Sequence, residues 1–119
     1  MQPGKVDFEQ RTGLTFAFFW KFRFDDGTLR SFTGSTIVFH GQSGDTTFHY
    51  TSPSANVALT TVEATANAGI RTTIPYTTTD DWLDEQVFFY QLDEWVSGER
   101  FTLAEGNIIA VRGVVDGAD

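Results

Sequence analysis

One segment, residues 14–24, constrains the fold more than any other part of the chain. It reads LTFAFFWKFRF, with large apolar residues at the even-numbered positions. Successive side chains of a β-strand point to opposite faces, so this alternation predicts a strand with one apolar face turned to the core. The core-facing residues expected from the pattern are Leu14, Phe16, Phe18, Trp20, Phe22 and Phe24. The opposite face is expected to carry Phe19 together with Lys21 and Arg23.

The remaining chain consists of short apolar or alternating runs separated by turn residues. Asp26-Gly27 is a strong hairpin signal, because both residues tolerate a positive φ. Residues 79–84 are the one candidate for a short helical turn, with Thr79 as its N-cap. Pro75 limits the strand that precedes it, and weak alternation places residues 57–64 at a sheet edge. Further strands are predicted at residues 28–32, 35–40, 46–51, 57–64, 70–74, 86–92, 100–103 and 107–115.

About eight short strands with regularly spaced turn signals are typical of an all-β fold. The 12 phenylalanines agree with this, because aromatic residues suit a pleated, half-buried sheet surface. We therefore predict a single antiparallel β-sandwich, immunoglobulin-like or related, with one short helical turn. With 119 residues, the chain is expected to form one domain over residues 1–119, with residues 1–10 and 116–119 as frayed tails.

The balance of charge argues against a nucleic-acid partner. Eight basic residues stand against 16 acidic ones, which gives a net charge of −8, and the basic residues are scattered along the chain. A protein that binds a phosphate backbone needs clustered cations. We also expect no membrane partner, because no apolar run reaches the roughly 20 residues that span a bilayer. The chain has no cysteine, which excludes disulfides, thiolate metal sites and a cysteine nucleophile.

Two features of the sequence are weak candidates for metal binding. His40 and His49 lie on neighbouring predicted strands and could face each other across a hairpin, as two zinc ligands or a pH-sensitive pair. Two imidazoles fall short of the usual three or four zinc ligands, which favours two half-exposed strand histidines instead. The acidic run at residues 80–85 lacks the spacing of a calcium-binding loop, and a capped helical turn explains it. We therefore expect no metal, no cofactor, no catalytic residue and no small-molecule substrate.

The three tryptophans are candidates for contacts with other molecules. Trp20 belongs to the alternating strand and is expected in the core, whereas Trp82 and Trp95 lie in connecting segments. Aromatic residues are enriched at the centres of protein interfaces, and exposed ones can also stack on sugars. Phe19, Trp82 and Trp95 are therefore our candidate interface residues.

Several strand-and-turn motifs occur in a familiar order along the chain. They are Asp26-Gly27-Thr28-Leu29, residues 32–39 (FTGSTIVF), residues 68–75 (AGIRTTIP), Tyr90-Gln91-Leu92 and residues 100–111 (RFTLAEGNIIAV). Together they resemble the small β-sandwich modules of tailed-phage virions, such as the N-terminal module of baseplate upper proteins and the related tail-fibre-attachment and neck-associated proteins. The resemblance covers nearly the whole chain, from Leu14 to Val115.

This resemblance implies a non-enzymatic structural protein. It would be an adaptor or decoration subunit of the tail, baseplate, neck or capsid surface, located in the virion after assembly in the host cytoplasm. Its implied partners are other virion proteins and further copies of itself in a symmetric oligomer. The first alternative is a carbohydrate-binding module that uses exposed aromatics such as Trp82 and Trp95. The second alternative is an enzyme such as a hydrolase, against which stands the absence of any catalytic motif in the sequence.

Overall fold

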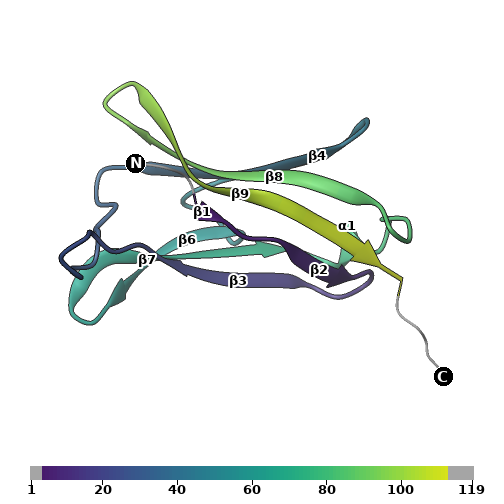
Figure 1. Ribbon diagram of the computed structural model, residues 1–119, viewed down its shortest axis with the longest axis horizontal. Helices are drawn as coiled ribbons and strands as arrows, with labels where there is room; N and C mark the ends of the chain where they lie inside the picture. Colours follow the sequence, from purple (N-terminus) through teal and green to yellow (C-terminus); the bar gives the residue numbers. More distant parts are fainter. Residues whose placement is uncertain (1–3, 113–119) are drawn as a thin grey trace.

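Two β-sheets lie face to face and enclose the core, as the computed structural model, which describes residues 4–112, shows (Figure 1). The larger sheet contains, in spatial order, β1 (Gly4–Lys5) and β2 (Phe8–Arg11) along one edge, then β9 (Glu99–Val111), β8 (Val87–Val96), β4 (Thr36–Ser43) and β5 (Thr46–Thr51). The smaller sheet has the order β3 (Phe16–Lys21), β7 (Thr65–Ile74) and β6 (Val57–Val62). The prediction of an all-β sandwich is confirmed, with nine strands in the residues described and β6 at a sheet edge as expected.

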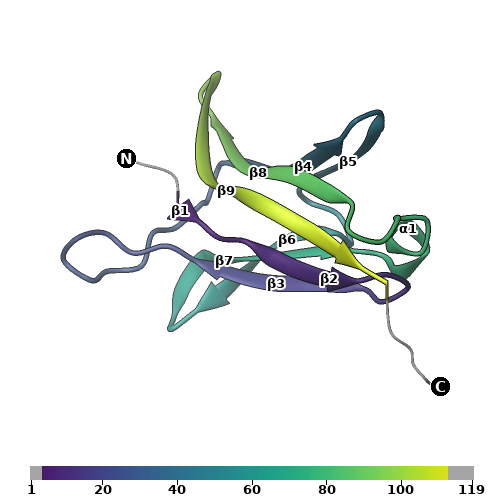
Figure 2. The same cartoon turned by 45° about the vertical axis from the view of Figure 1, so that its right-hand side comes forward.

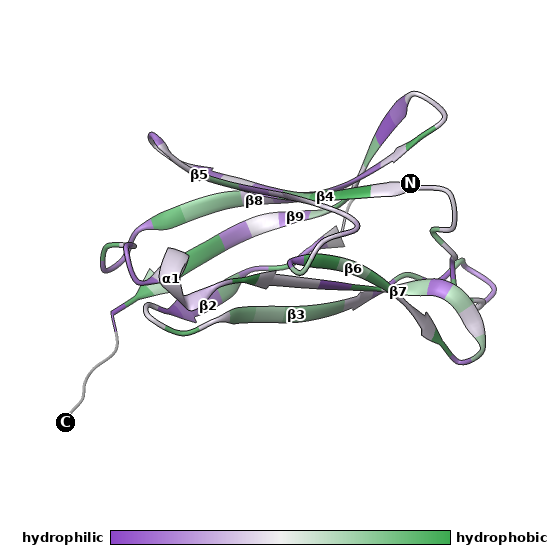
Figure 3. Ribbon diagram, turned by 180° about the vertical axis from the view of Figure 1, so that it is seen from behind, coloured by the Kyte–Doolittle hydropathy of each residue, from purple (hydrophilic) through white to green (hydrophobic). Residues whose placement is uncertain are grey.

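The alternating segment forms β3 and supplies the centre of the core. Phe16 and Trp20 are almost fully buried, and the indole N–H of Trp20 donates to the hydroxyl of Thr72 at 2.9 Å. The strand is shorter than predicted, so Leu14 and Phe24 lie beyond its ends and are exposed. Hydrophobic stretches on strands of both sheets line the same interior (Figure 3). Two further residues of the predicted apolar face pack against this core with partial exposure: Phe18 and Phe22.

The N-terminal segment is part of the larger sheet, which corrects the prediction of a frayed tail for residues 4–10. β1 and β2 pair with β9 in parallel, so this sheet is mixed rather than purely antiparallel (Figure 2). The physical reason is Phe8, whose ring centroid lies 5.1 Å from that of Phe16 and 4.8 Å from that of Phe18. Full burial of an aromatic side chain stabilises a fold by about 2 kcal/mol, and Phe8, which is partly buried, gains part of this and helps to hold a short strand in place. The predicted tail at residues 116–119 lies outside the described residues.

The last strand, β9, is one continuous element where the sequence predicts two. The two predicted strands, 100–103 and 107–115, leave residues 104–106 as a break, but these residues pair with residues 90–92 of β8. Gly106 leaves room here for the carbonyl group of Val6, because a Cβ added at Gly106 would stand 2.1 Å from that carbonyl oxygen. The glycine therefore marks the close approach of the N-terminal segment rather than a turn.

The predicted strand at residues 28–32 is present only as a single bridge between Arg23 and Leu29. Phe32 is fully buried, and the guanidinium carbon of Arg30 lies 4.8 Å from the centre of its ring. Two backbone hydrogen bonds, from Phe24 to Thr28 and from Arg30 to Phe22, and the packing of Phe32 therefore fix this connection, although no full strand forms.

The one short helix described, α1 (Tyr76–Thr79), begins three residues earlier than predicted. Pro75 precedes it, and its φ of −62° suits the start of a helix. Thr79 ends the helix instead of capping it, and its hydroxyl donates to the carbonyl oxygen of Leu14 at 2.8 Å. No helix within residues 4–112 is long and apolar enough to cross a membrane.

Candidate binding site on the larger sheet

The three aromatic residues that the sequence proposes as contacts lie in different environments. Phe19 is 44% exposed on the outer face of the smaller sheet, and Trp95 is 43% exposed on the outer face of the larger sheet. Trp82 is only 1% exposed, and its ring centroid lies 4.2 Å from that of Phe88. Trp82 is therefore a core residue that anchors the segment after α1, and a role in a surface contact does not fit this structure.

The ring of Phe19 rests against Gly69 on the neighbouring strand β7. A Cβ added at Gly69 would stand 2.3 Å from Cζ of Phe19, so the ring occupies the space that a side chain would fill. Arg71 is the residue directly opposite Phe19 in the β3–β7 pairing. The smaller sheet therefore presents an apolar ring that is partly exposed and seated against its neighbour strand.

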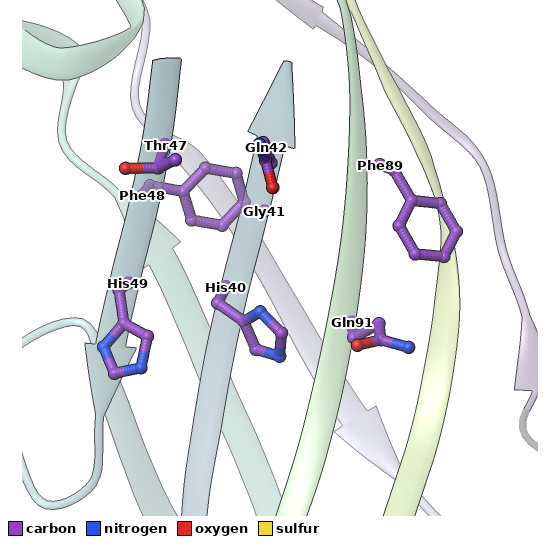
Figure 4. Close-up of a pocket in the computed structure, with 8 residues that line it drawn as sticks. All are labelled: His40, Gly41, Gln42, Thr47, Phe48, His49, Phe89 and Gln91. Carbon is purple, nitrogen blue, oxygen red and sulfur yellow. The ribbon is translucent and has the colours of Figure 1, made fainter. Parts of the chain in front are cut away.

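A shallow trough runs over the outer face of the larger sheet. A row of three polar side chains crosses it: His49 on β5, His40 on β4 and Gln91 on β8 (Figure 4). Two adjoining hollows of about 320 and 370 Å³ share these histidines. Phe89 lines the first hollow and Trp95 lines the second, so the polar row lies between two aromatic residues. We call this feature the trough and define it by seven residues: His40, His49, Phe89, Gln91, Asp93, Trp95 and Arg100.

A buried carboxylate, that of Asp93, forms part of the trough. Its side chain is 1% exposed although it belongs to the outer face of the sheet. Oδ2 accepts a hydrogen bond from Nε2 of His40 at 2.8 Å and lies 3.4 Å from Nε of Arg100. Oδ1 has no hydrogen-bond partner within residues 4–112. The register of β8 against β9 shifts between Leu92 and Asp93, and such bulges re-aim side chains, often beside functional sites.

The neighbouring Glu94 is paired more completely. Its side chain is 3% exposed and points to the opposite side of the sheet. Oε1 pairs with Arg30, and Oε2 accepts a hydrogen bond from Oγ of Ser35 at 2.6 Å. This network ties the connection between β3 and β4 to β8. Asp93, in contrast, keeps one oxygen unpaired, which costs about 1–3 kcal/mol for a buried acceptor.

Arg100 connects the carboxylate of Asp93 to the aromatic side chain of Trp95. Its guanidinium carbon lies 5.6 Å from the centre of the Trp95 ring, which is within cation–π range. The Arg100 side chain is 50% exposed, so its charged end stays accessible beside the indole. Asp93 and Arg100 together therefore fix one end of the trough.

The two histidines face each other across the β4–β5 hairpin, as their positions in the sequence predict. Their ring centroids are 6.0 Å apart, and His40 is held by Asp93.

In the acidic run at residues 80–85, the carboxylate of Asp84 accepts a hydrogen bond from the backbone N–H of Arg112 at 2.9 Å. Across the described part of the chain, no group of three or more His, Asp or Glu side chains is placed to hold a metal ion.

The His40–Asp93 pair shares one element with a catalytic triad, in which a carboxylate orients an imidazole. In a triad, the second ring nitrogen also hydrogen-bonds a nucleophile. Between residues 4 and 112, His40 makes no hydrogen bond to a serine or threonine hydroxyl. The arrangement is suited to binding, because it presents oriented polar groups and two exposed aromatic rings on one face.

Sequence reasoning did not identify Asp93, Arg100 or Gln91 as site residues. The predicted strand ended at Leu92, because two consecutive acidic residues are unusual within a strand. In the structure, β8 continues to Val96 and carries both carboxylates. The apolar pair Trp95-Val96 directly after the two acids was the sequence signal that the strand continues and could have indicated the site.

No family model matches this sequence, and a search of curated proteins finds no similar one.

Proposed function

We propose that this chain is a non-enzymatic structural protein of tailed-phage virions. In this role it serves as an adaptor or decoration subunit of the tail, baseplate, neck or capsid surface. It acts through symmetric contacts with copies of itself and through contacts with other virion proteins. The order of its strand-and-turn motifs supports this proposal, and the exposed ring of Phe19 is the observation that carries it.

The strand order supports an immunoglobulin-like sandwich as part of this proposal. In immunoglobulin-like variable domains, one sheet contains strands G, F, C and C′, and the other contains strands B, E and D. In this chain, β9, β8, β4 and β5 follow the first order, and β3, β7 and β6 follow the second. Such a sandwich leaves faces and edge strands available for contacts with neighbouring subunits.

Phe19 is well placed for a contact between subunits. Its ring is 44% exposed near the middle of β3 and is backed by Gly69. Within the described residues β3 pairs only with β7, so its other edge is open. A second copy of the chain can therefore cover the Phe19 ring and approach the β3 edge at the same time. Aromatic residues in such positions commonly dominate the binding energy of an interface.

Light scattering after size-exclusion chromatography tests this contact. We expect the wild-type chain to form a defined symmetric oligomer, and we expect Phe19→Ala to shift it to the monomer without changing its circular dichroism. Trp95→Ala is the matched control, because it removes an equally exposed aromatic ring from the other sheet. A wild-type chain that stays monomeric, or an oligomer that Phe19→Ala leaves intact, would contradict the proposed contact.

A further inference from the structure

We propose that the trough on the larger sheet binds an extended, neutral oligosaccharide. The proposal goes beyond the structural role and does not depend on it, because Phe19 lies on the other sheet. It follows from the length of the trough, its two aromatic residues, the polar row between them and the buried carboxylate that orients part of that row.

The length of the trough indicates a chain of sugars rather than a single one. Phe89 and Trp95 are six residues apart on β8, and a strand rises about 3.3 Å per residue. The two residues are therefore separated by roughly 20 Å along the strand. Their even separation also places both side chains on the same face. A linear oligosaccharide of several rings fits this span, whereas a monosaccharide covers only part of it.

Exposed aromatic rings provide the apolar contacts that sugars require. Trp95 is 43% exposed and Phe89 is 51% exposed. A pyranose ring presents C–H groups on its face and hydroxyl groups around its rim. It can therefore lie flat against an aromatic ring while its rim remains free to hydrogen-bond.

Planar polar side chains lie between the two aromatic residues. His49, His40 and Gln91 come from three neighbouring strands (Figure 4), which are spaced about 4.8 Å apart in a sheet. Imidazole and amide groups present donors and acceptors in the plane of the side chain. Sugar hydroxyls both donate and accept, so successive hydroxyls of a chain can be satisfied by groups arranged in such a row.

Asp93 acts as a positioning residue for this site. It is too buried to touch a ligand, but its Oδ2 holds His40 and lies close to Arg100. A buried carboxylate with one unpaired oxygen is poorly explained by stability, because desolvation offsets what its ion pairs contribute. Fixing polar side chains before a ligand arrives reduces the entropy lost on binding, and this accounts for the arrangement.

Charge and sheet geometry favour a neutral saccharide over other ligands. The net charge of −8 opposes the approach of acidic polysaccharides and nucleic acids. An extended peptide gains most by pairing with an open strand edge. Of the described strands under the trough, β4, β8 and β9 are already paired on both sides, and only β5 has an open edge, so most of the trough offers no backbone for a peptide to pair with.

Trp95 provides a direct readout of binding. Trp20 and Trp82, the other two tryptophans, are 4% and 1% exposed, so acrylamide in solution quenches mainly the fluorescence of Trp95. The probes are glucose, galactose, mannose and N-acetylglucosamine, each as the monosaccharide and as a linear oligosaccharide. We expect at least one oligosaccharide to protect Trp95 from acrylamide and to shift its indole N–H resonance alone. We also expect that oligosaccharide to bind more tightly than its monosaccharide.

Variants of the full chain identify the site by calorimetric titration. Phe89→Ala and Arg100→Ala are each expected to weaken binding by roughly tenfold. Phe19→Ala is the matched control and should bind as the wild type does, whether or not it alters assembly. Unchanged indole resonances of Trp20 and Trp82 verify that each variant is folded. The proposal is overturned if none of the saccharides protects Trp95, or if Phe89→Ala and Arg100→Ala both leave binding unchanged.

Discussion

At the scale of single residues, the adjacent carboxylates of Asp93 and Glu94 lie on opposite faces of β8 and are paired differently. Glu94 uses both oxygens, and its partner Arg30 is largely buried with it. Asp93 leaves Oδ1 unpaired, and its partners His40 and Arg100 are 29% and 50% exposed. Loss of the Asp93 charge therefore leaves partners that water can still solvate, whereas loss of the Glu94 charge leaves the guanidinium of Arg30, which at 21% exposure is solvated less than either of them.

Asp93→Asn is accordingly expected to leave the free energy of unfolding unchanged or to raise it by up to about 1 kcal/mol. Glu94→Gln is the matched comparison and is expected to lower that free energy by about 3 kcal/mol. Urea denaturation followed by tryptophan fluorescence measures both values. If Asp93→Asn destabilises the protein as much as Glu94→Gln does, Asp93 has a structural role and the positioning role is wrong.

Tyr90 connects the larger sheet to the N-terminal segment and gives stability a dependence on alkaline pH. Its hydroxyl donates to the carbonyl oxygen of Val6 at 2.5 Å. Burial, together with the carboxylates of Asp7 and Glu105, raises the pKa of Tyr90 well above its ordinary value. The neutral phenol therefore persists to higher pH in the folded state than in the unfolded state. This contribution to stability is complete below about pH 10 and is lost as pH rises toward the raised pKa.

Tyr90→Phe is expected to lower the free energy of unfolding by about 1 kcal/mol near neutral pH, because it removes the hydrogen bond to Val6. Above about pH 10, the stability of the variant should fall less steeply than that of the wild type. Urea denaturation at a series of pH values measures this slope. If the free energy of unfolding falls equally steeply with pH in both proteins above that pH, the ionisation of Tyr90 does not contribute to the loss of stability.

At the scale of secondary-structure elements, the pairing of the N-terminal strands with β9 depends on Gly106. The carbonyl oxygen of Val6 lies 2.1 Å from the position that a Cβ at Gly106 would occupy, and Val6 donates its N–H to the carbonyl oxygen of Glu105 at 3.1 Å. A side chain at residue 106 therefore has to displace the backbone of Val6, and backbone moves less easily than the end of a flexible side chain.

Gly106→Ala is expected to lower the free energy of unfolding by roughly 2–3 kcal/mol, because the N-terminal segment has to move and Phe8 loses part of its packing. Hydrogen exchange should show faster exchange of the amides that join β2 to β9. Gly4→Ala is the control, since its Cβ would stand 3.8 Å from the nearest heavy atom, an ordinary contact. Equal stability of the two variants would mean that the N-terminal strands do not need this close approach.

Much of the fold could be predicted from elements with clear local patterns. The alternation in residues 14–24 indicated β3 and its buried face, and the spacing of His40 and His49 indicated the β4–β5 hairpin. Elements that depend on contacts between distant residues were missed. β2 is held by Phe8 against Phe16 and Phe18, and nothing in the short, polar N-terminal sequence signals that partnership.

The candidate site was predictable only in part, for the same physical reason. The exposure of Phe19 and the facing histidines follow from positions along a single strand or a hairpin, whereas Trp95 was placed in a connecting segment and lies on β8. The meeting of Asp93 with His40 and Arg100 depends on the order of β4, β8 and β9 and on a bulge, which local sequence does not encode.

At the scale of the whole molecule, the sandwich carries two different outer surfaces. The smaller sheet exposes Phe19 beside an open strand edge, which is suited to contact with another subunit. The larger sheet carries the trough, in which polar side chains lie between two aromatic ones. The two surfaces lie on opposite sides of the core, so a subunit attached through one leaves the other exposed to solution.

We propose above that the chain is a structural component of a tailed-phage particle. Quantitative mass spectrometry of gradient-purified particles, from a lysate in which the chain's gene is expressed, measures whether the chain is part of them. We predict that the chain copurifies with the particles at a fixed copy number that matches a symmetry of the tail or capsid, and that Phe19→Ala lowers this number. Recovery of the chain only in the soluble fraction, with none in particles, would contradict the claim.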